Sequence, residues 1–256
     1  MTDATHPNGM QSESLPKGDA AFREEGLAIL KNIFPLEMLA GLGRALSMRL
    51  ASETRDALDD QIMAAERRDH ALVYQAAQSV GSSASAYQLL GHSQFVSSLF
   101  TLTDLDESEL HIMPMYLVIQ LPGDRRFDYG WHQDHAYYPW CSRMVTVWFP
   151  VNRATTAETG TIGVLPGSHR WPRTSQTHYR HGYFRQIEAE VSEPEVAQEQ
   201  ALHLELGDCC IMDGDLVHRS VSNLSATPRV AAVARMVALS REATYQRERF
   251  YCLHKP

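Results

Sequence analysis

The sequence has few cysteines, no long apolar run and no excess of positive charge. Its four cysteines form no Cys-x-x-Cys pair, so neither a zinc knuckle nor a disulfide framework is indicated. If Cys209 and Cys210 lie on a strand, their side chains point to opposite faces. No window approaches the roughly 18 consecutive apolar residues that a membrane span needs. Residues 1–21 are polar and mixed in charge, unlike a signal peptide. We therefore expect a cytoplasmic protein without a membrane partner.

The charge balance is acidic. Among 256 residues, 23 Lys and Arg stand against 31 Asp and Glu, which gives a formal net charge of −8. This balance argues against nonspecific nucleic-acid binding. With 44% hydrophobic and 21% charged residues, the composition is that of a soluble globular protein, and it excludes disorder of the whole chain.

The chain divides into a polar start, a helical portion and a β-rich portion. We expect residues 1–20 to form a disordered tail and residues 21–256 to form a single domain. A short strand is predicted over residues 27–30. Leucines at helical spacing after Pro35 predict a helix, and a second helix is predicted over residues 93–101, within a helical portion of about 35–110.

Short apolar segments between turns predict strands from about residue 111 to 240. The segments are residues 112–121, 144–151, 161–165, 201–206, 209–212, 216–221 and 230–239. Helices come first and strands follow, which favours a sandwich or barrel over a parallel sheet. The period alone does not distinguish a jelly roll from an immunoglobulin-like sandwich. Within this portion, the polar residues 171–200 are either a functional lid or a disordered insert.

The segment Trp131-His132-Gln133-Asp134 contains half of a possible metal site. On a strand, residues two apart face the same side, so His132 and Asp134 would converge. The pair is a weak signal by itself, but His218 follows on a later strand-like segment. Two histidines and one carboxylate are the facial triad of non-heme Fe(II) oxygenases, whereas zinc usually prefers a closed tetrahedral set.

Arg229 lies eleven residues after His218, beyond a turn-rich connection. Its guanidinium could lie beside His218 on the next strand, where a buried arginine needs an anionic partner. Ser220 would share the face of His218. A ligand with a carboxylate at one end and metal-chelating oxygens at the other has the layout of 2-oxoglutarate. The alternative for Arg229 is a surface ion pair.

Three ordered blocks resemble the phytanoyl-CoA dioxygenase family of Fe(II)- and 2-oxoglutarate-dependent oxygenases. The resemblance covers roughly residues 20 to 240. The blocks are Trp131-His132-Gln133-Asp134 followed by Tyr137-Tyr138-Pro139, the Gly-rich segment 160–169, and His218-Arg219-Ser220 with Asn223, Ser225 and Arg229. It implies a mainly β fold with flanking helices, a cupin-like double-stranded β-helix or jelly roll.

The resemblance also implies roles for individual residues. His132, Asp134 and His218 would bind iron, and Arg229 and Ser220 would bind the distal carboxylate of 2-oxoglutarate. Trp148 and Leu117 match positions that line the cosubstrate pocket, with core packing as the alternative. A further basic or polar residue of the cosubstrate site is not located, and the candidates are Tyr74, Gln75 and Gln120.

The implied activity is that of an Fe(II)- and 2-oxoglutarate-dependent dioxygenase that uses dioxygen and releases succinate and carbon dioxide. We expect it to hydroxylate an unactivated C–H bond of a small molecule from natural-product biosynthesis or small-metabolite catabolism. The candidate substrate contacts are Trp131, Gln133, Tyr137 and Tyr138.

Other readings stay open. Related halogenases lack the carboxylate ligand, so the presence of Asp134 disfavours halogenation. Desaturation, epimerisation and ring formation use the same oxidant. A catalytically silent jelly roll that binds a metal or ligand, and a cupin-type isomerase or hydrolase, are the alternatives from other classes. The sequence does not predict an oligomeric state.

Overall fold

The computed structural model describes residues 18–50, 57–103, 105, 110–126, 128–174, 177–180 and 184–239. Most of the predicted tail, residues 1–17, lies outside the described residues. Gly18–Glu25 already forms helix α1, so the last three residues of the predicted tail belong to a helix.

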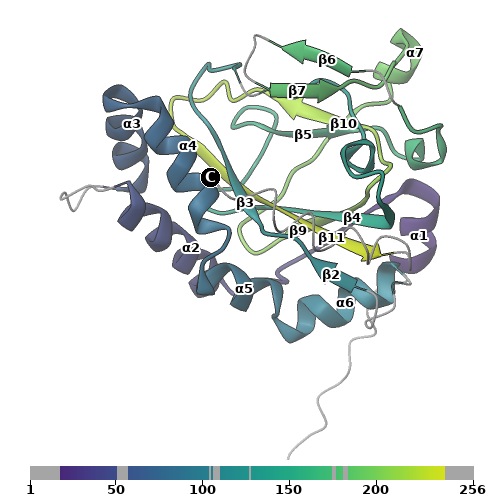
Figure 1. Cartoon of the computed structure of the whole chain (residues 1–256), viewed down its shortest axis with the longest axis horizontal. Helices are drawn as coiled ribbons and strands as arrows, with labels where there is room; N and C mark the ends of the chain where they lie inside the picture. Colours follow the sequence, from purple (N-terminus) through teal and green to yellow (C-terminus); the bar gives the residue numbers. More distant parts are fainter. Residues whose placement is uncertain are drawn as a thin grey trace, which may run out of the picture.

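Six helices precede most of the strands. They are α1 (Gly18–Glu25), α2 (Leu36–Arg49), α3 (Leu58–Arg68), α4 (His70–Val80), α5 (Ala84–Leu90) and α6 (Ser93–Thr103). Helices α2 and α6 confirm the helices predicted after Pro35 and over residues 93–101. The helices α3, α4 and α5 fill the predicted helical portion, and α2 to α6 line one side of the molecule (Figure 1). None of the helices in the described ranges is both long and apolar enough to cross a membrane.

Local signals explain where two of these helices begin. Asp69 accepts a hydrogen bond from the backbone N–H of Ala71 at the start of α4, and Ser83 accepts one from Ala86 at the start of α5. Near the C-terminus of α4, Gly81 packs against the backbone of Met115, which leaves no space for a Cβ atom. A glycine at this position therefore lets the end of α4 lie directly against the backbone at Met115.

The larger sheet has six strands in the order β1-β9-β4-β11-β2, with β3 also paired to β11. Its strands are β1 (Leu27–Leu30), β2 (Leu110–Ile112), β3 (Tyr116–Gln120), β4 (Cys141–Pro150), β9 (Cys209–Asp213) and β11 (Arg229–Leu239). Every pairing is antiparallel. Strand β11 is central, because β4 pairs along one side of it and β2 and β3 along the other.

A smaller sheet faces the interior side of the large one. It contains β5 (Thr161–Val164), β8 (Gln200–Ala201) and β10 (His218–Val221) in the order β10-β5-β8. A separate hairpin, β6 (Thr177–Arg180) with β7 (Phe184–Ile187), and the short helix α7 (Glu193–Val196) lie at the outer edge of this sheet (Figure 1). The predicted jelly roll with flanking helices is thereby confirmed.

Alternation along the strands separates two apolar cores. On β4, Val147 and Phe149 pack in the cluster that the helices cover, whereas Trp148 packs in the cluster between the sheets. Cys209 and Cys210 divide in the same way, as predicted. The interior side of the large sheet is therefore the side on which β3, β4 and β11 can present polar groups to a cavity.

Asp208 holds the turn before β9 against the end of β1. Its carboxylate is buried and accepts hydrogen bonds from the ammonium of Lys31 at 2.8 Å and from the backbone N–H groups of Asn32 and Glu205, each at 2.9 Å. Burial alone would raise the pKa of Asp208, but these donors lower it below its ordinary value.

Replacing Asp208 with asparagine should lower the free energy of unfolding by about 1–3 kcal/mol at pH 7. A carboxylate with a depressed pKa stabilises the fold at neutral pH, and this contribution disappears as the pH falls through its folded-state pKa. Urea denaturation should therefore show a difference between wild type and variant that shrinks on acidification. A pH-independent difference would contradict the assignment of a stabilising charge.

Candidate active site

His132, Asp134 and His218 meet in the interior. Each offers one ligand atom, and these atoms all lie within 4.8 Å of one another. His132 precedes the short 3₁₀ helix Asp134–Tyr137, and its backbone pairs with that of His218 at the start of β10. All three residues are buried. The predicted group of ligands is thus assembled from two segments that lie far apart in the sequence.

Both imidazoles are prepared to bind a metal through Nε2. His132 Nδ1 lies 2.7 Å from the carbonyl oxygen of Gly130, and His218 Nδ1 lies 2.9 Å from that of Leu216. Because a carbonyl can only accept, each Nδ1 carries the proton and each Nε2 has a free lone pair. Burial, with a contribution from neighbouring His218, lowers the pKa of His132 to about 3, which keeps it neutral. This donor set fits a divalent cation.

Asp134 is held at both of its oxygens. Thr146 Oγ1 donates to Oδ2 at 2.6 Å, and Arg235 Nη2 donates to Oδ1 at 2.7 Å. Burial alone would raise the pKa of Asp134, but the charge of Arg235, together with the two imidazoles, lowers it well below the ordinary value. The carboxylate is therefore ionised, as a metal ligand must be.

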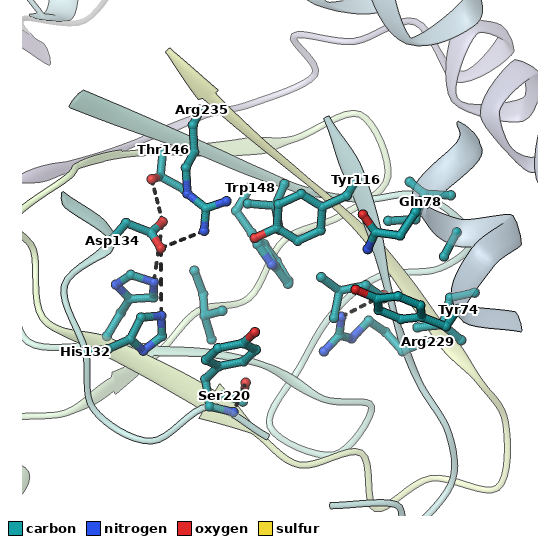
Figure 2. Close-up of a pocket in the computed structure, with 18 of the residues that line it drawn as sticks. Tyr74, Gln78, Tyr116, His132, Asp134, Thr146, Trp148, Ser220, Arg229 and Arg235 are labelled. Atoms are coloured by element: carbon teal, nitrogen blue, oxygen red, sulfur yellow. Dashed lines mark hydrogen bonds and ion pairs between the residues drawn. The ribbon is translucent and has the colours of Figure 1, made fainter. Parts of the chain in front are cut away.

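Arg235 stands on β11 between two aromatic rings. Its Cζ atom lies 5.2 Å from the ring centre of Tyr116 and 5.3 Å from that of Tyr138. These cation–π contacts fix the plane of the guanidinium. Figure 2 shows Arg235 and Thr146 converging on Asp134 from the same side of the cavity.

Arg229 stands on the same strand at the other side of the cavity, which Tyr74 also lines (Figure 2). It is buried, and within the described residues its guanidinium forms no ion pair and its Nε–H has no acceptor. It donates to Gln120 Oε1, while Gln120 Nε2 donates to Asp128 Oδ1 at 2.6 Å. Burial lowers the pKa of Arg229 to about 10, opposed by the charge of Asp128, so it stays cationic at neutral pH. A buried cation with an unused donor is suited to an anionic ligand.

The other predicted cosubstrate residues lie around Arg229 and the triad. The Trp148 ring centre is 5.6 Å from Arg229 Cζ. Ser220 lines the cavity with His218, and its hydroxyl oxygen accepts from the backbone N–H of Tyr129. Leu117 also lines the cavity, but its side chain belongs to the apolar cluster under the helices. Its role as a cosubstrate contact stays a prediction.

Of the three candidates for a further cosubstrate residue, Gln120 contacts Arg229 directly and Tyr74 lines the cavity. Gln75 is exposed, and the cavity lining contains Gln78 of the same helix instead. This outcome follows from the helical period, since Gln78 lies one turn after Tyr74 and Gln75 does not share their face.

A cavity of about 500 Å³ connects these groups. It extends from the triad along β3 and β11 to helices α3 and α4. Aromatic side chains form much of its wall, namely Tyr74, Tyr116, Tyr129, Tyr137, Tyr138 and Trp148. The volume suits a small molecule, since ligand pockets typically span about 300–1,000 Å³.

The predicted substrate contacts divide into two pairs. Tyr137 and Tyr138 line the cavity. Trp131 and Gln133 are not in the lining that the described residues form, and their role as substrate contacts stays a prediction. Gln133 is buried, and both ends of its side-chain amide are hydrogen-bonded. Its Nε2 donates to the carbonyl oxygen of Asp215, and its Oε1 accepts from the backbone N–H of Thr174. Trp131 instead packs against Arg219, whose Cζ atom lies 5.2 Å from the centre of the Trp131 ring.

The segment 171–200 is tied to the site by these and similar bonds. Arg173 pairs with Asp215, and the hydroxyl of Tyr137 accepts from the backbone N–H of Ile187 at 2.8 Å. Residues 175–176 and 181–183 of this segment lie outside the described residues. Movement of the segment as a lid stays a prediction.

Sequence reasoning missed Arg235, Thr146 and Tyr116. A signal for Arg235 was available, because it is the one charged residue between Val230 and Leu239. A lone arginine in an apolar central strand must be paired or bound to a ligand. Thr146 and Tyr116 carried no such signal, since their residue types are common in strands.

Comparison with known proteins gives a family match over most of the chain. The family model described as phytanoyl-CoA dioxygenase matches residues 22–231. The multifunctional dioxygenase prhA of Penicillium brasilianum is 32% identical over 111 residues, which cover 40% of this chain and 34% of that protein. The match thus spans about one third of the length of this curated relative.

Solved structures share the fold. EvdO2 from Micromonospora carbonacea var. aurantiaca, complexed with 2-oxoglutarate, matches with a TM-score of 0.61 and 21% identity, over 88% of this chain and 91% of that chain. The epimerase SnoN, in complex with Fe³⁺, alpha-ketoglutarate and nogalamycin RO, matches with a TM-score of 0.62 and 16% identity, over 87% and 82% of the two chains.

Proposed function

Because the chain belongs to the phytanoyl-CoA dioxygenase family, a family of Fe(II)- and 2-oxoglutarate-dependent oxygenases, we propose that it hydroxylates an unactivated C–H bond of a small molecule. The proposal is carried by one observation. A buried His-Asp-His group and a buried arginine without an ion-pair partner among the described residues line the same cavity. Together they match the two ends of 2-oxoglutarate.

The metal end is formed by His132, Asp134 and His218. When bound there, Fe(II) with 2-oxoglutarate and dioxygen supplies the oxidising power for C–H cleavage, as the cosubstrate becomes succinate and carbon dioxide. His132, Asp134 and His218 would each contribute one ligand atom to the metal. The backbone acceptors at Gly130 and Leu216 keep both imidazoles in the ligating tautomer.

The other end is formed by Arg229. Its guanidinium would bind the distal carboxylate, with Ser220 as a second donor and the Trp148 ring as a wall. Gln120 orients the guanidinium through one hydrogen bond and is itself oriented by Asp128.

The substrate would bind beside the triad against Tyr137 and Tyr138. Aromatic walls favour an apolar or ring-containing molecule with a few polar groups. A natural-product intermediate or small metabolite fits this description better than a polymer. The position of the reacting C–H bond decides whether the product is hydroxylated, desaturated, epimerised or cyclised. Hydroxylation is the simplest of these outcomes.

An anaerobic titration tests the proposal. Fe(II) and 2-oxoglutarate together should produce a weak metal-to-ligand charge-transfer band that neither produces alone, and admission of air should release succinate. EDTA added before the metal should remove both signals. A panel of amino acids, polyketide or terpenoid intermediates and acyl thioesters should then contain a compound that increases the succinate yield.

Two outcomes would point elsewhere. Metal binding without the band or succinate would indicate a binding module on the same fold. Turnover of a substrate without oxygen and 2-oxoglutarate would indicate a cupin-type isomerase or hydrolase.

A further inference from the structure

Asp134 is restrained more than a metal ligand requires. Thr146 on β4 and Arg235 on β11 are directly opposite each other in the antiparallel register, and both side chains reach the same carboxylate. They engage different oxygens, at 2.6 Å and 2.7 Å. Two donors on opposite oxygens fix the rotation of the carboxylate about its Cβ–Cγ bond.

The two imidazoles also approach different oxygens of Asp134. His132 Nε2 lies 3.9 Å from Oδ1, and His218 Nε2 lies 4.0 Å from Oδ2. A carboxylate that could turn freely in this position would be able to present both oxygens to one cation. Such chelation would occupy a coordination position that a bidentate cosubstrate needs.

We propose that Thr146 and Arg235 form a carboxylate clamp, which limits Asp134 to one ligating oxygen and so keeps positions open for 2-oxoglutarate. This inference rests on the proposed function. Thr146 and Arg235 are positioning residues in this scheme, since each acts through Asp134. The sheet supplies their rigidity, because both stand on hydrogen-bonded central strands and the aromatic rings of Tyr116 and Tyr138 hold the guanidinium.

The clamp has a distinctive expected signature. Arg235 offsets part of the negative charge of Asp134, so its removal does not weaken attraction for a cation. The freed carboxylate instead turns toward the cation with both oxygens. Metal affinity should therefore stay the same or rise, whereas affinity for 2-oxoglutarate should fall.

The experiment measures two affinities without turnover. Mn(II) binding is measured by the electron paramagnetic resonance signal of free Mn(II), and 2-oxoglutarate binding to the Mn(II)-loaded protein is measured by calorimetry. Arg235→Gln should weaken 2-oxoglutarate binding on the order of 10-fold without weakening Mn(II) binding. Thr146→Val, which leaves the arginine charge in place, should shift 2-oxoglutarate affinity a few-fold in the same direction.

Controls separate the clamp from general damage. Arg143→Gln removes an arginine from the same strand as Thr146, but one that donates to Thr103 O and does not line the cavity, and it should change neither affinity. If Arg235→Gln does not fold, Thr146→Val carries the test. Loss of both affinities together would overturn the proposal by indicating a merely structural role, and so would unchanged affinities in both clamp variants. Failure of the wild type to bind Mn(II) and 2-oxoglutarate would instead refute the proposed function, and the clamp with it.

Discussion

Replacing Asp134 with alanine should abolish succinate formation and reduce Fe(II) affinity by at least about 100-fold. The variant loses the anionic ligand of the triad and leaves Arg235, whose side chain is 12% exposed, beside His132 and His218 without its carboxylate partner. An uncompensated, largely buried cation next to a cation site opposes metal binding directly. Calorimetric titration with Fe(II) under argon and a succinate assay in air are the measurements.

The same substitution threatens the fold, because breaking one partner of a buried ion pair typically costs about 3–5 kcal/mol. Asp134→Asn is the appropriate companion variant, since its amide oxygen can still accept from Arg235. It should be folded by circular dichroism and still fail to release succinate. Asp60→Ala, which removes an exposed carboxylate on α3, should behave as wild type. Wild-type succinate yield in Asp134→Ala would refute the site assignment.

Replacing Arg229 with alanine should raise the KM for 2-oxoglutarate on the order of 100-fold, because truncating one partner of a buried charge pair costs about 2–5 kcal/mol. The effect should fall mainly on cosubstrate binding, since Arg229 lies across the cavity from the triad. Metal affinity in the absence of cosubstrate should change little. Initial rates of succinate formation at varied 2-oxoglutarate give the KM, and Fe(II) titration gives the control value.

Stability offers an independent check on Arg229. A buried guanidinium without an ion-pair partner in the described chain contributes desolvation cost to the ligand-free protein. Its removal should therefore lower the free energy of unfolding far less than it lowers cosubstrate affinity. Arg229→Lys should restore part of the affinity, because a single ammonium cannot reproduce a two-point contact. Arg44→Ala, on the exposed face of α2, is the matched control. Equal losses of stability and affinity in Arg229→Ala would indicate a structural residue.

Much of this architecture could be predicted because strand periodicity carries information about faces. The opposite directions of Cys209 and Cys210 follow from a two-residue repeat, a local rule that tertiary packing did not override. His132 and Asp134 do converge as predicted, but Asp134 begins a 3₁₀ helix, so the strand on which that prediction is based is not present. Arg229 faces the cavity as expected, but it does not lie beside His218, because β10 and β11 belong to different sheets and Arg229 stands across the cavity from the triad.

Other contacts could not be predicted, for physical reasons. Gln133 and Trp131 neighbour the metal ligands in sequence, but in the structure Gln133 accepts a hydrogen bond from Thr174 and Trp131 packs against Arg219. Thr146 could not be found from sequence because its role arises from lying opposite Arg235 across a strand pair. Cross-strand neighbours depend on register, which a single sequence does not specify.

One strand carries both arginines of the cavity. Arg229 and Arg235 point the same way on β11, with Ala231 and Val233 between them, and six residues of extended chain span roughly 20 Å. Because β11 is hydrogen-bonded along both edges, the Cα atoms of these arginines cannot shift along the strand axis without breaking the ladder. Under the proposed function, this fixes the backbone point from which Arg229 reaches the distal carboxylate. We therefore expect oxaloacetate, one methylene shorter than 2-oxoglutarate, and 2-oxoadipate, one methylene longer, to bind more weakly than 2-oxoglutarate.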